Sequence, residues 1–119
     1  MKPGQGKPLP KKSGFVFVGR PADFDKKSHL TVRIMGKPVA VFRDRDTEAF
    51  YAREMGCKHQ GADLSAMPIR DNIVVCDRHG WKYDVSTGRC ISHDAPPLRP
   101  HEVAVEGDAV FVSLFPIEA

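Results

Sequence analysis

The stretch CDRHGW, residues 76–81, places a thiol and an imidazole three positions apart, at Cys76 and His79. Nineteen residues earlier, the stretch CKHQGA places Cys57 and His59 two positions apart. Of the three cysteines in the chain, two therefore stand close to a histidine. Cysteine thiolates and histidine imidazoles are the soft and borderline ligands that transition metals prefer. The two pairs, separated by sixteen residues, therefore predict a metal centre shared between two loops.

Four interpretations of these pairs compete. The four side chains could be ordinary core or surface residues, but two independent Cys/His pairs rarely coincide. A structural zinc site suits two thiolates and two imidazoles, yet familiar zinc patterns group their cysteines as C-x-x-C or with slightly longer spacing. A Cys–His catalytic pair would lack a third, orienting group. An iron–sulfur cluster with mixed ligands accounts best for the alternating order of cysteine and histidine.

Charge and composition exclude several other classes. The formal net charge is +3, but residues 1–12 carry four lysines and no acid, so the remaining chain has 14 basic and 15 acidic residues. The chain is therefore not expected to bind nucleic acid. Residues 1–13, with three prolines and no apolar block, are expected to form a flexible basic arm. No signal peptide or membrane span is expected, so we predict a cytoplasmic protein whose cysteines are ligands or thiols rather than disulfides.

Period-two alternation of apolar and polar residues dominates the rest of the chain. The 20 glycines and prolines among 119 residues exceed the usual fraction of about 12% and favour short strands joined by turns. We therefore predict one all-β domain over residues 14–119, an antiparallel sandwich or barrel of nine or ten strands without a helix. The strands are expected at 14–20, 29–35, 38–43, 48–55 and 72–77, in two pieces across 82–92, and in a hairpin over 101–115, with tight turns at Gly36-Lys37 and at 106–108.

The motif C-x-H-x16-C-x-x-H resembles the signature of the Rieske [2Fe–2S] family. The longer pieces CKHQGADLS and CDRHGWKYDVSTGRC extend the likeness, which covers about residues 14–115. The resemblance implies a Rieske-type sandwich or barrel in which two loops form a cluster-binding subdomain at about 55–98. It also implies one [2Fe–2S] cluster per chain, with one iron held by two cysteines and the other by two histidines. These ligands would be Cys57 and Cys76, and His59 and His79.

Residues around the predicted ligands distinguish two branches of the family. The high-potential branch has an extra cysteine in each loop, where this chain has Ala62 and Arg78, so the disulfide of that branch cannot form here. That branch also has a serine at the position of Trp81, whereas Tyr83 is retained and would bond the sulfur of Cys57. Hydrogen bonds to cluster sulfur raise the reduction potential. The missing serine therefore predicts a potential in the lower half of the Rieske range of about −150 to +300 mV.

Further residues have roles that the resemblance implies. Pro96 and Pro97 resemble the loop that covers the cluster in this family, and their fixed φ would make a stiff lid. The alternative for this loop is a plain connection between strands. The side chains at the tips of the loops would meet a redox partner, although a solvated surface is the alternative for them; these are Lys58, Gln60 and Arg78. We expect Cys90, the third cysteine, to be a small buried hydrophobic residue rather than a ligand.

The resemblance implies an electron-transfer component rather than an enzyme. Rieske oxygenases carry a second domain with mononuclear iron, for which 119 residues leave no room. The chain therefore resembles the ferredoxin of a Rieske oxygenase system. Such a protein would be a monomeric one-electron carrier between a flavoprotein or iron–sulfur reductase and a terminal dioxygenase or monooxygenase. A Rieske subunit or redox-sensing module of a larger complex is the alternative, and a structural zinc domain is a more remote one.

Overall fold

A computed structural model describes residues 9–57, 63–77 and 80–117 of the chain. Within these ranges the chain forms nine strands and two short 3₁₀ helices, and no α-helix. The strands are β1 (Phe15–Gly19), β2 (His29–Ile34), β3 (Lys37–Arg43), β4 (Phe50–Glu54), β5 (Ile69–Arg70), β6 (Ile73–Val75), β7 (Lys82–Asp84), β8 (Pro100–Glu106) and β9 (Ala109–Pro116). The 3₁₀ helices, which were not predicted from the sequence, are η1 (Pro21–Phe24) and η2 (Leu64–Ala66).

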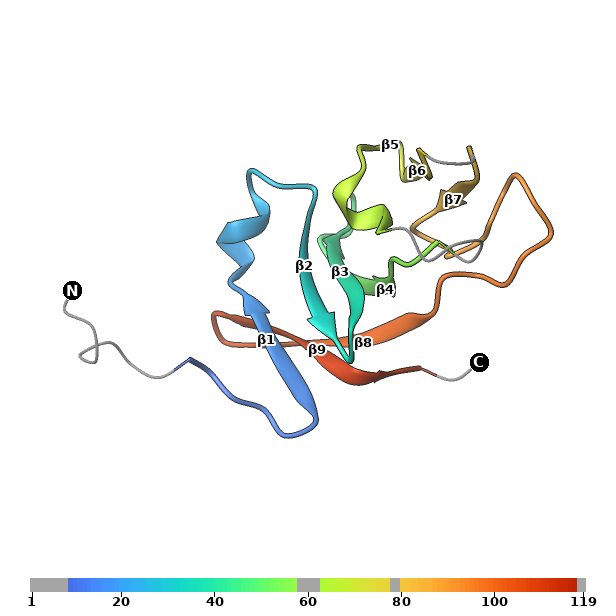
Figure 1. Ribbon diagram of the computed structural model, residues 1–119. Helices are drawn as coiled ribbons and strands as arrows, with labels where there is room; N and C mark the ends of the chain where they lie inside the picture. The colour runs from blue at the N-terminus through green and yellow to red at the C-terminus, as the bar shows by residue number, and fades with distance from the viewer. Residues whose placement is uncertain (1–8, 58–62, 78–79, 118–119) are drawn as a thin grey trace.

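Two antiparallel sheets carry the fold (Figure 1). Six strands form the larger one in the order β1-β9-β8-β4-β3-β2, which we call the base sheet. Its two edge strands, β1 and β2, lie in contact, so the base sheet nearly closes into a barrel. The smaller one, called here the loop sheet, has the order β5-β6-β7 and lies beside one end of the base sheet. This arrangement confirms the predicted all-β, barrel-like architecture.

Strand β3 is buried on both faces and divides the interior into two cores. Successive side chains of a strand point to opposite faces, so Ala40 and Phe42 enter one core while Val39 and Val41 enter the other. The first, which we call the cysteine core, consists of Ala40, Phe42, Met55, Cys57, Leu64, Val74, Cys76, Tyr83, Val85 and Leu98. The second, the barrel core, consists of Phe24, Ile34, Val39, Val41, Ala52, Val110 and Val112.

Turn positions differ slightly from the sequence-based prediction. The β2–β3 hairpin turns at Met35 and Gly36, whose φ angles are 52° and 78°. Two central residues with positive φ are typical of the tight turn that matches the twist of a two-stranded hairpin. The predicted turn was one residue late, because Lys37 is already the first residue of β3 and pairs with Ile34. The β8–β9 hairpin turns after Glu106, as predicted.

The predicted second strand in the 82–92 segment is reduced to one isolated bridge, between Tyr83 and Cys90. After β7 the chain turns sharply, because Asp84 accepts hydrogen bonds from the backbone N–H and the hydroxyl of Ser86. The segment then continues into the proline-rich connection to β8. Backbone hydrogen bonds flank this bridge, from the N–H of Asp84 to the carbonyl of Arg89 at 2.9 Å and from the N–H of Ile91 to the carbonyl of Lys82 at 2.8 Å.

The described part of the N-terminal arm contacts the far end of the base sheet. Lys12 Nζ lies 2.6 Å from a carboxylate oxygen of Glu106 and 5.2 Å from the ring centroid of Phe15. An exposed ion pair of this kind contributes about 0–1 kcal/mol, so it guides the chain into β1 without fixing it firmly. Residues 1–8 lie outside the described ranges. Neither 3₁₀ helix in the described part of the chain has the length or apolarity to span a bilayer.

Candidate metal centre

The first Cys/His loop, residues 57–62, leaves the end of β4 and is closed at its base by backbone contacts. Gly56 and Asp63 form an antiparallel bridge, and the N–H of Leu64 donates to the carbonyl of Met55 at 2.7 Å. Asp63 then caps the short helix η2 by accepting from the N–H of Ser65 at 2.9 Å. These contacts bring the two ends of the loop together and fix where Cys57 begins it.

The second loop, residues 76–81, is closed in a similar way between β6 and β7. The N–H of Cys76 donates to the carbonyl of Trp81 at 2.8 Å, and the N–H of Gly80 donates to the carbonyl of Cys76 at 2.8 Å. Gly80 has a φ of 72°, which favours glycine over any residue with a side chain. Both loops therefore begin and end at backbone that is held by hydrogen bonds, and a site built on such supported segments is held more rigidly.

The two cysteines that begin these loops pack in the same core. Cys57 is 2% exposed and Cys76 is 1% exposed, and both belong to the cysteine core. Sequence positions nineteen apart are thus brought to one buried site by the loop sheet and the end of β4. Two sulfur atoms in one apolar enclosure suit a soft metal centre, and thiolates are the ligands that iron–sulfur clusters use.

The hydroxyl of Tyr83 lies against the sulfur of Cys57. Tyr83 is the middle residue of β7, is 0% exposed, and places its hydroxyl oxygen 3.7 Å from Cys57 Sγ. A metal-bound thiolate has no hydrogen, so in a loaded site the hydroxyl would be the donor. The sequence-based prediction paired the same two residues. The structure brings them together, while the effect of this contact on the potential stays a prediction.

Two side chains of the base sheet reach the segments beside the loops. From β2, His29 Nε2 lies 2.7 Å from the carbonyl of Ser65, and a carbonyl can only accept, so the imidazole donates. From β4, the Arg53 guanidinium donates to the carbonyls of Val85 and Ser86, which follow β7. Burial lowers the pKa of Arg53 from its ordinary value, but a guanidinium still keeps its charge at neutral pH. Sequence reasoning missed both residues, because nothing in the local pattern announces a long-range contact.

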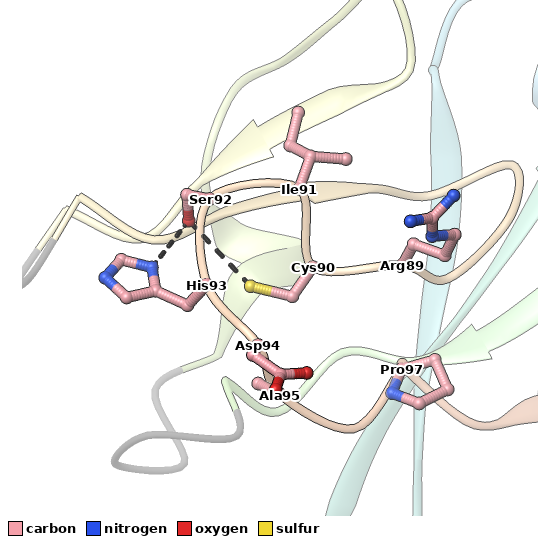
Figure 2. Close-up of a pocket in the computed structure, with 8 residues that line it drawn as sticks. All are labelled: Arg89, Cys90, Ile91, Ser92, His93, Asp94, Ala95 and Pro97. Atoms are coloured by element: carbon pink, nitrogen blue, oxygen red, sulfur yellow. Dashed lines mark hydrogen bonds between the residues drawn. The ribbon is translucent and has the colours of Figure 1, made fainter.

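The third cysteine lies apart from the other two, in the wall of a surface cavity of about 570 Å³ (Figure 2). Cys90 is partly exposed, so the prediction that it is buried was wrong. The hydroxyl of Ser92 stands between its neighbours, 3.8 Å from Cys90 Sγ and 2.7 Å from His93 Nδ1 (Figure 2). The ring of Trp81 stacks on that of His93, with the ring centroids 4.2 Å apart. Trp81, the last residue of the second loop, is therefore held against the proline-rich connection by an aromatic contact.

Pro96 and Pro97 are both exposed. The residue of this connection that enters the cysteine core is Leu98, which is 0% exposed and packs in the same cluster as both cysteines. An apolar residue directly after two prolines was the available signal for it. The lid role of the prolines stays a prediction. The predicted ligands and docking residues that lie outside the described ranges are His59, His79, Lys58, Gln60 and Arg78.

Comparison with known proteins identifies the fold and the cofactor. Residues 14–112 match the family model of the Rieske [2Fe–2S] domain. The chain belongs to the Rieske [2Fe–2S] family. Its cofactor is the Rieske-type [2Fe–2S] cluster of that family, as the motif predicted.

Several relatives within the Rieske family are ferredoxins. Ferredoxin CarAc of Metapseudomonas resinovorans is 35% identical over 82 residues, which cover 68% of this chain and 75% of that protein. The ferredoxin component of biphenyl 2,3-dioxygenase from Rhodococcus jostii (strain RHA1) is 38% identical over 66 residues, covering 55% of this chain and 62% of that one. A chain in the solved complex of reduced oxygenase and oxidized ferredoxin in carbazole 1,9a-dioxygenase superposes with a TM-score of 0.75 at 28% identity, over 91% of this chain and 100% of that chain. The matched regions thus make up most of the length of these chains.

Longer Rieske proteins also match, and the likeness covers only a small part of them. The matched region is 13% of oxidoreductase NdmD from Pseudomonas putida and 25% of the 4beta-methylsterol monooxygenase from Methylococcus capsulatus. The shared unit is therefore the Rieske domain itself.

The described residues include two of the four side chains expected to hold a Rieske cluster, and these two fit it. Two buried cysteines, each at the closed base of its loop, would supply the thiolates for one iron, and the Tyr83 hydroxyl lies against the sulfur of Cys57. Among residues 9–57, 63–77 and 80–117, no group of three or more His, Cys, Asp or Glu side chains gathers as for a metal ion. The two histidines expected to complete the set belong to the undescribed loop segments. Their role as ligands is part of the proposal below.

Proposed function

We propose that this protein is a one-electron carrier that accepts electrons from a reductase and delivers them to a terminal Rieske oxygenase. Cys57, His59, Cys76 and His79 would hold the cluster. When bound, a Rieske-type [2Fe–2S] cluster accepts and releases one electron at a time. The donor would be a flavoprotein or an iron–sulfur reductase, and the acceptor a dioxygenase or monooxygenase. The carrier would work as a cytoplasmic monomer with one cluster per chain.

The observation that carries this proposal is the burial of two loop cysteines in one core of a chain that resembles whole ferredoxins. The likeness to the carbazole 1,9a-dioxygenase chain extends over its full length, and the likeness to ferredoxin CarAc covers most of that protein. We assign residues 14–119 to the Rieske domain, with the cluster-binding part at about 55–98 and residues 1–13 as a basic arm.

The protein residues would have separate tasks in this role. The cysteine core would keep water away from the thiolates, and the Tyr83 hydroxyl would donate a hydrogen bond to the sulfur of Cys57. The loop tips would form the contact with redox partners through Lys58, Gln60 and Arg78. Weak, transient electron-transfer contacts bury less than about 1,200 Å², which a pair of loop tips can supply.

A second candidate function is a Rieske subunit or redox-sensing module of a larger oxidoreductase. The matches within NdmD and the 4beta-methylsterol monooxygenase favour it, because the same domain is a minor part of both proteins. The two functions differ in how the protein is purified. A carrier elutes as a monomer without partners, whereas a subunit co-purifies with a partner in fixed ratio.

The test of the proposed function combines spectroscopy with electron delivery. We expect a brown protein with about two irons per chain, whose reduced form gives an electron paramagnetic resonance signal with a mean g clearly below that of all-cysteine clusters. The reduced protein is mixed in a stopped-flow instrument with an oxidised Rieske oxygenase or, in a parallel experiment, with an oxidised all-cysteine ferredoxin at the same concentration. The oxygenase should reoxidise it faster. A colourless protein carrying one zinc ion would overturn the proposal.

The contact between Tyr83 and Cys57 predicts a lower reduction potential for Tyr83→Phe. The substitution removes the hydroxyl and leaves the buried ring, so the packing of the cysteine core is retained. A hydrogen bond to a charged acceptor stabilises the more negative, reduced state, and a net loss of about 1 kcal/mol corresponds to a shift of about −40 mV for one electron. A redox titration followed by visible absorbance measures it. Tyr51→Phe, at the edge of the same core, is the control that should leave the potential in place.

A further inference from the structure

Two segments of the chain touch at two separate places. At one end, Cys57 Sγ lies 3.7 Å from the hydroxyl of Tyr83. At the other end, the Arg53 guanidinium donates from Nε to the carbonyl of Val85 at 3.0 Å and from Nη2 to the carbonyl of Ser86 at 2.8 Å. Arg53 precedes Cys57 by four residues, and Val85 follows Tyr83 by two. The arginine contact and the sulfur contact thus join the same two segments of the chain, residues 53–57 and 83–86.

The turn that Arg53 holds has support on its other side as well. The N–H of Leu98 donates to the carbonyl of Gly88 at 2.7 Å, and the N–H of Val85 donates to the carbonyl of Asn72 at 2.8 Å. A Cβ atom on Gly88 would stand 3.6 Å from Arg53 Nη1, so the guanidinium packs directly beside this glycine. The turn after β7 is therefore held by hydrogen bonds from the Arg53 guanidinium of the base sheet and from the backbone of the connection to β8.

We propose that Arg53 is a positioning residue for the cluster site. By fixing the turn that follows β7, it keeps the Tyr83 hydroxyl within reach of the Cys57 sulfur and thereby sets the reduction potential. The inference rests on the proposed function only in taking Cys57 as a cluster ligand. The oxygen–sulfur distance of 3.7 Å is already long, and hydrogen bonds weaken steeply when their geometry is poor. A small displacement of β7 is enough to weaken this contact.

Two substitutions of Arg53 distinguish an effect of its charge on the potential from an effect of its hydrogen bonds to the turn. Arg53→Met removes both the fork and the positive charge, and the lost charge alone would lower the potential. Arg53→Lys keeps a positive charge but replaces the planar fork by a single ammonium, which cannot bond both carbonyls in the same geometry. We expect Arg53→Lys to lower the midpoint potential in the direction of Tyr83→Phe. A wild-type potential in Arg53→Lys, with a lower one only in Arg53→Met, would show an effect of charge and overturn the proposal.

A double substitution tests whether the effect passes through Tyr83. In Arg53→Lys/Tyr83→Phe no hydroxyl is left to be misplaced, so its potential should equal that of Tyr83→Phe alone. Residues that act through one contact are non-additive in such a cycle, whereas independent effects add. Additive shifts would mean that Arg53 acts on the cluster by another route, and the positioning role would be abandoned.

Arg43 provides the matched control on the same sheet. Its guanidinium also binds a distant carbonyl, that of Pro21 at 3.3 Å, together with the carboxylate of Asp25 at 2.9 Å, on the side of η1. Arg43→Lys should lose a comparable amount of thermal stability without moving the potential. A potential shift in Arg43→Lys equal to that of Arg53→Lys would reduce both to a general loosening of the fold and overturn the proposal.

Iron content and the visible spectrum are recorded for each variant before its titration. Should Arg53→Lys hold too little iron to titrate, Arg53→Gln, which can still donate to one carbonyl, takes its place. Absence of a [2Fe–2S] spectrum from the wild-type protein would defeat the proposed function. A normal wild-type spectrum combined with an unchanged potential in the Arg53 variants would defeat only the role given to Arg53.

Discussion

Cys76→Ser is expected to abolish cluster binding and to lower the melting temperature by about 10 °C or more. Cys76 is 1% exposed and packs in the cysteine core, so the serine would remove a soft ligand and bury a hydroxyl. Burying a polar group without a partner costs about 1–3 kcal/mol, and about 4–8 °C accompanies each kcal/mol in a domain of this size. Loss of a cluster that binds only the folded state adds to this. Iron analysis, visible absorbance and thermal unfolding measure the three effects.

The third cysteine supplies the control for this substitution. Cys90 is partly exposed and lies 3.8 Å from the hydroxyl of Ser92, where a serine can make the same contact. Cys90→Ser should keep a full complement of iron and the wild-type spectrum, with a change in melting temperature of only a few degrees. Full iron content in Cys76→Ser would remove this residue from the ligand set.

Gly88→Ala is the second substitution with a large expected effect, and it leaves every predicted ligand in place. Gly88 has a φ of 83°, and a Cβ there would lie 2.6 Å from the carbonyl oxygen of Leu98. The left-handed conformation alone costs a residue with a side chain about 1–2 kcal/mol. Because backbone must also move, we expect a total loss of about 3 kcal/mol or more, measured by thermal or denaturant unfolding of the loaded protein.

Gly36→Ala isolates the steric part of that loss. Gly36 has a φ of 78°, close to that of Gly88, but nothing lies within 4 Å of the position that its Cβ would occupy. It should therefore show only the conformational cost of about 1–2 kcal/mol. Equal losses at both glycines would mean that the Leu98 carbonyl yields without cost and that the turn is held less firmly than the contacts indicate.

The strand pattern and the identity of the cofactor could be predicted from the sequence because both depend on local patterns. Alternating residues in HLTVRI and the Cys/His spacing each lie within a few positions, and the structure forms β2 from the former. Short elements escaped: η1, η2 and β5 have two to four residues each, too few for any period to be visible. Cys90 was predicted to be buried because it was placed in a strand after the turn, yet the pairing there is a single bridge with Tyr83.

The contacts that hold the site could not be read from the sequence for a different reason. Arg53 and His29 lie in strands whose pattern explains them as ordinary half-exposed positions. Their targets are backbone carbonyls at Val85, Ser86 and Ser65, more than 30 residues away. A carbonyl is present at every residue, so side-chain chemistry gives no hint of which one is chosen. Only the three-dimensional packing of the two sheets selects the partner.

Strand β3 is shared by the two cores, since one of its faces packs in the cysteine core and the other in the barrel core. The two halves of the molecule are coupled through this strand, because Ala40 and Phe42 pack in the cysteine core while Val39 and Val41 pack in the barrel core. A substitution that disturbs packing in the cysteine core is therefore expected to disturb packing in the barrel core as well. Under the proposed function, substitutions that adapt the two loops to a new redox partner are consequently constrained by the packing of β3, which supports both cores.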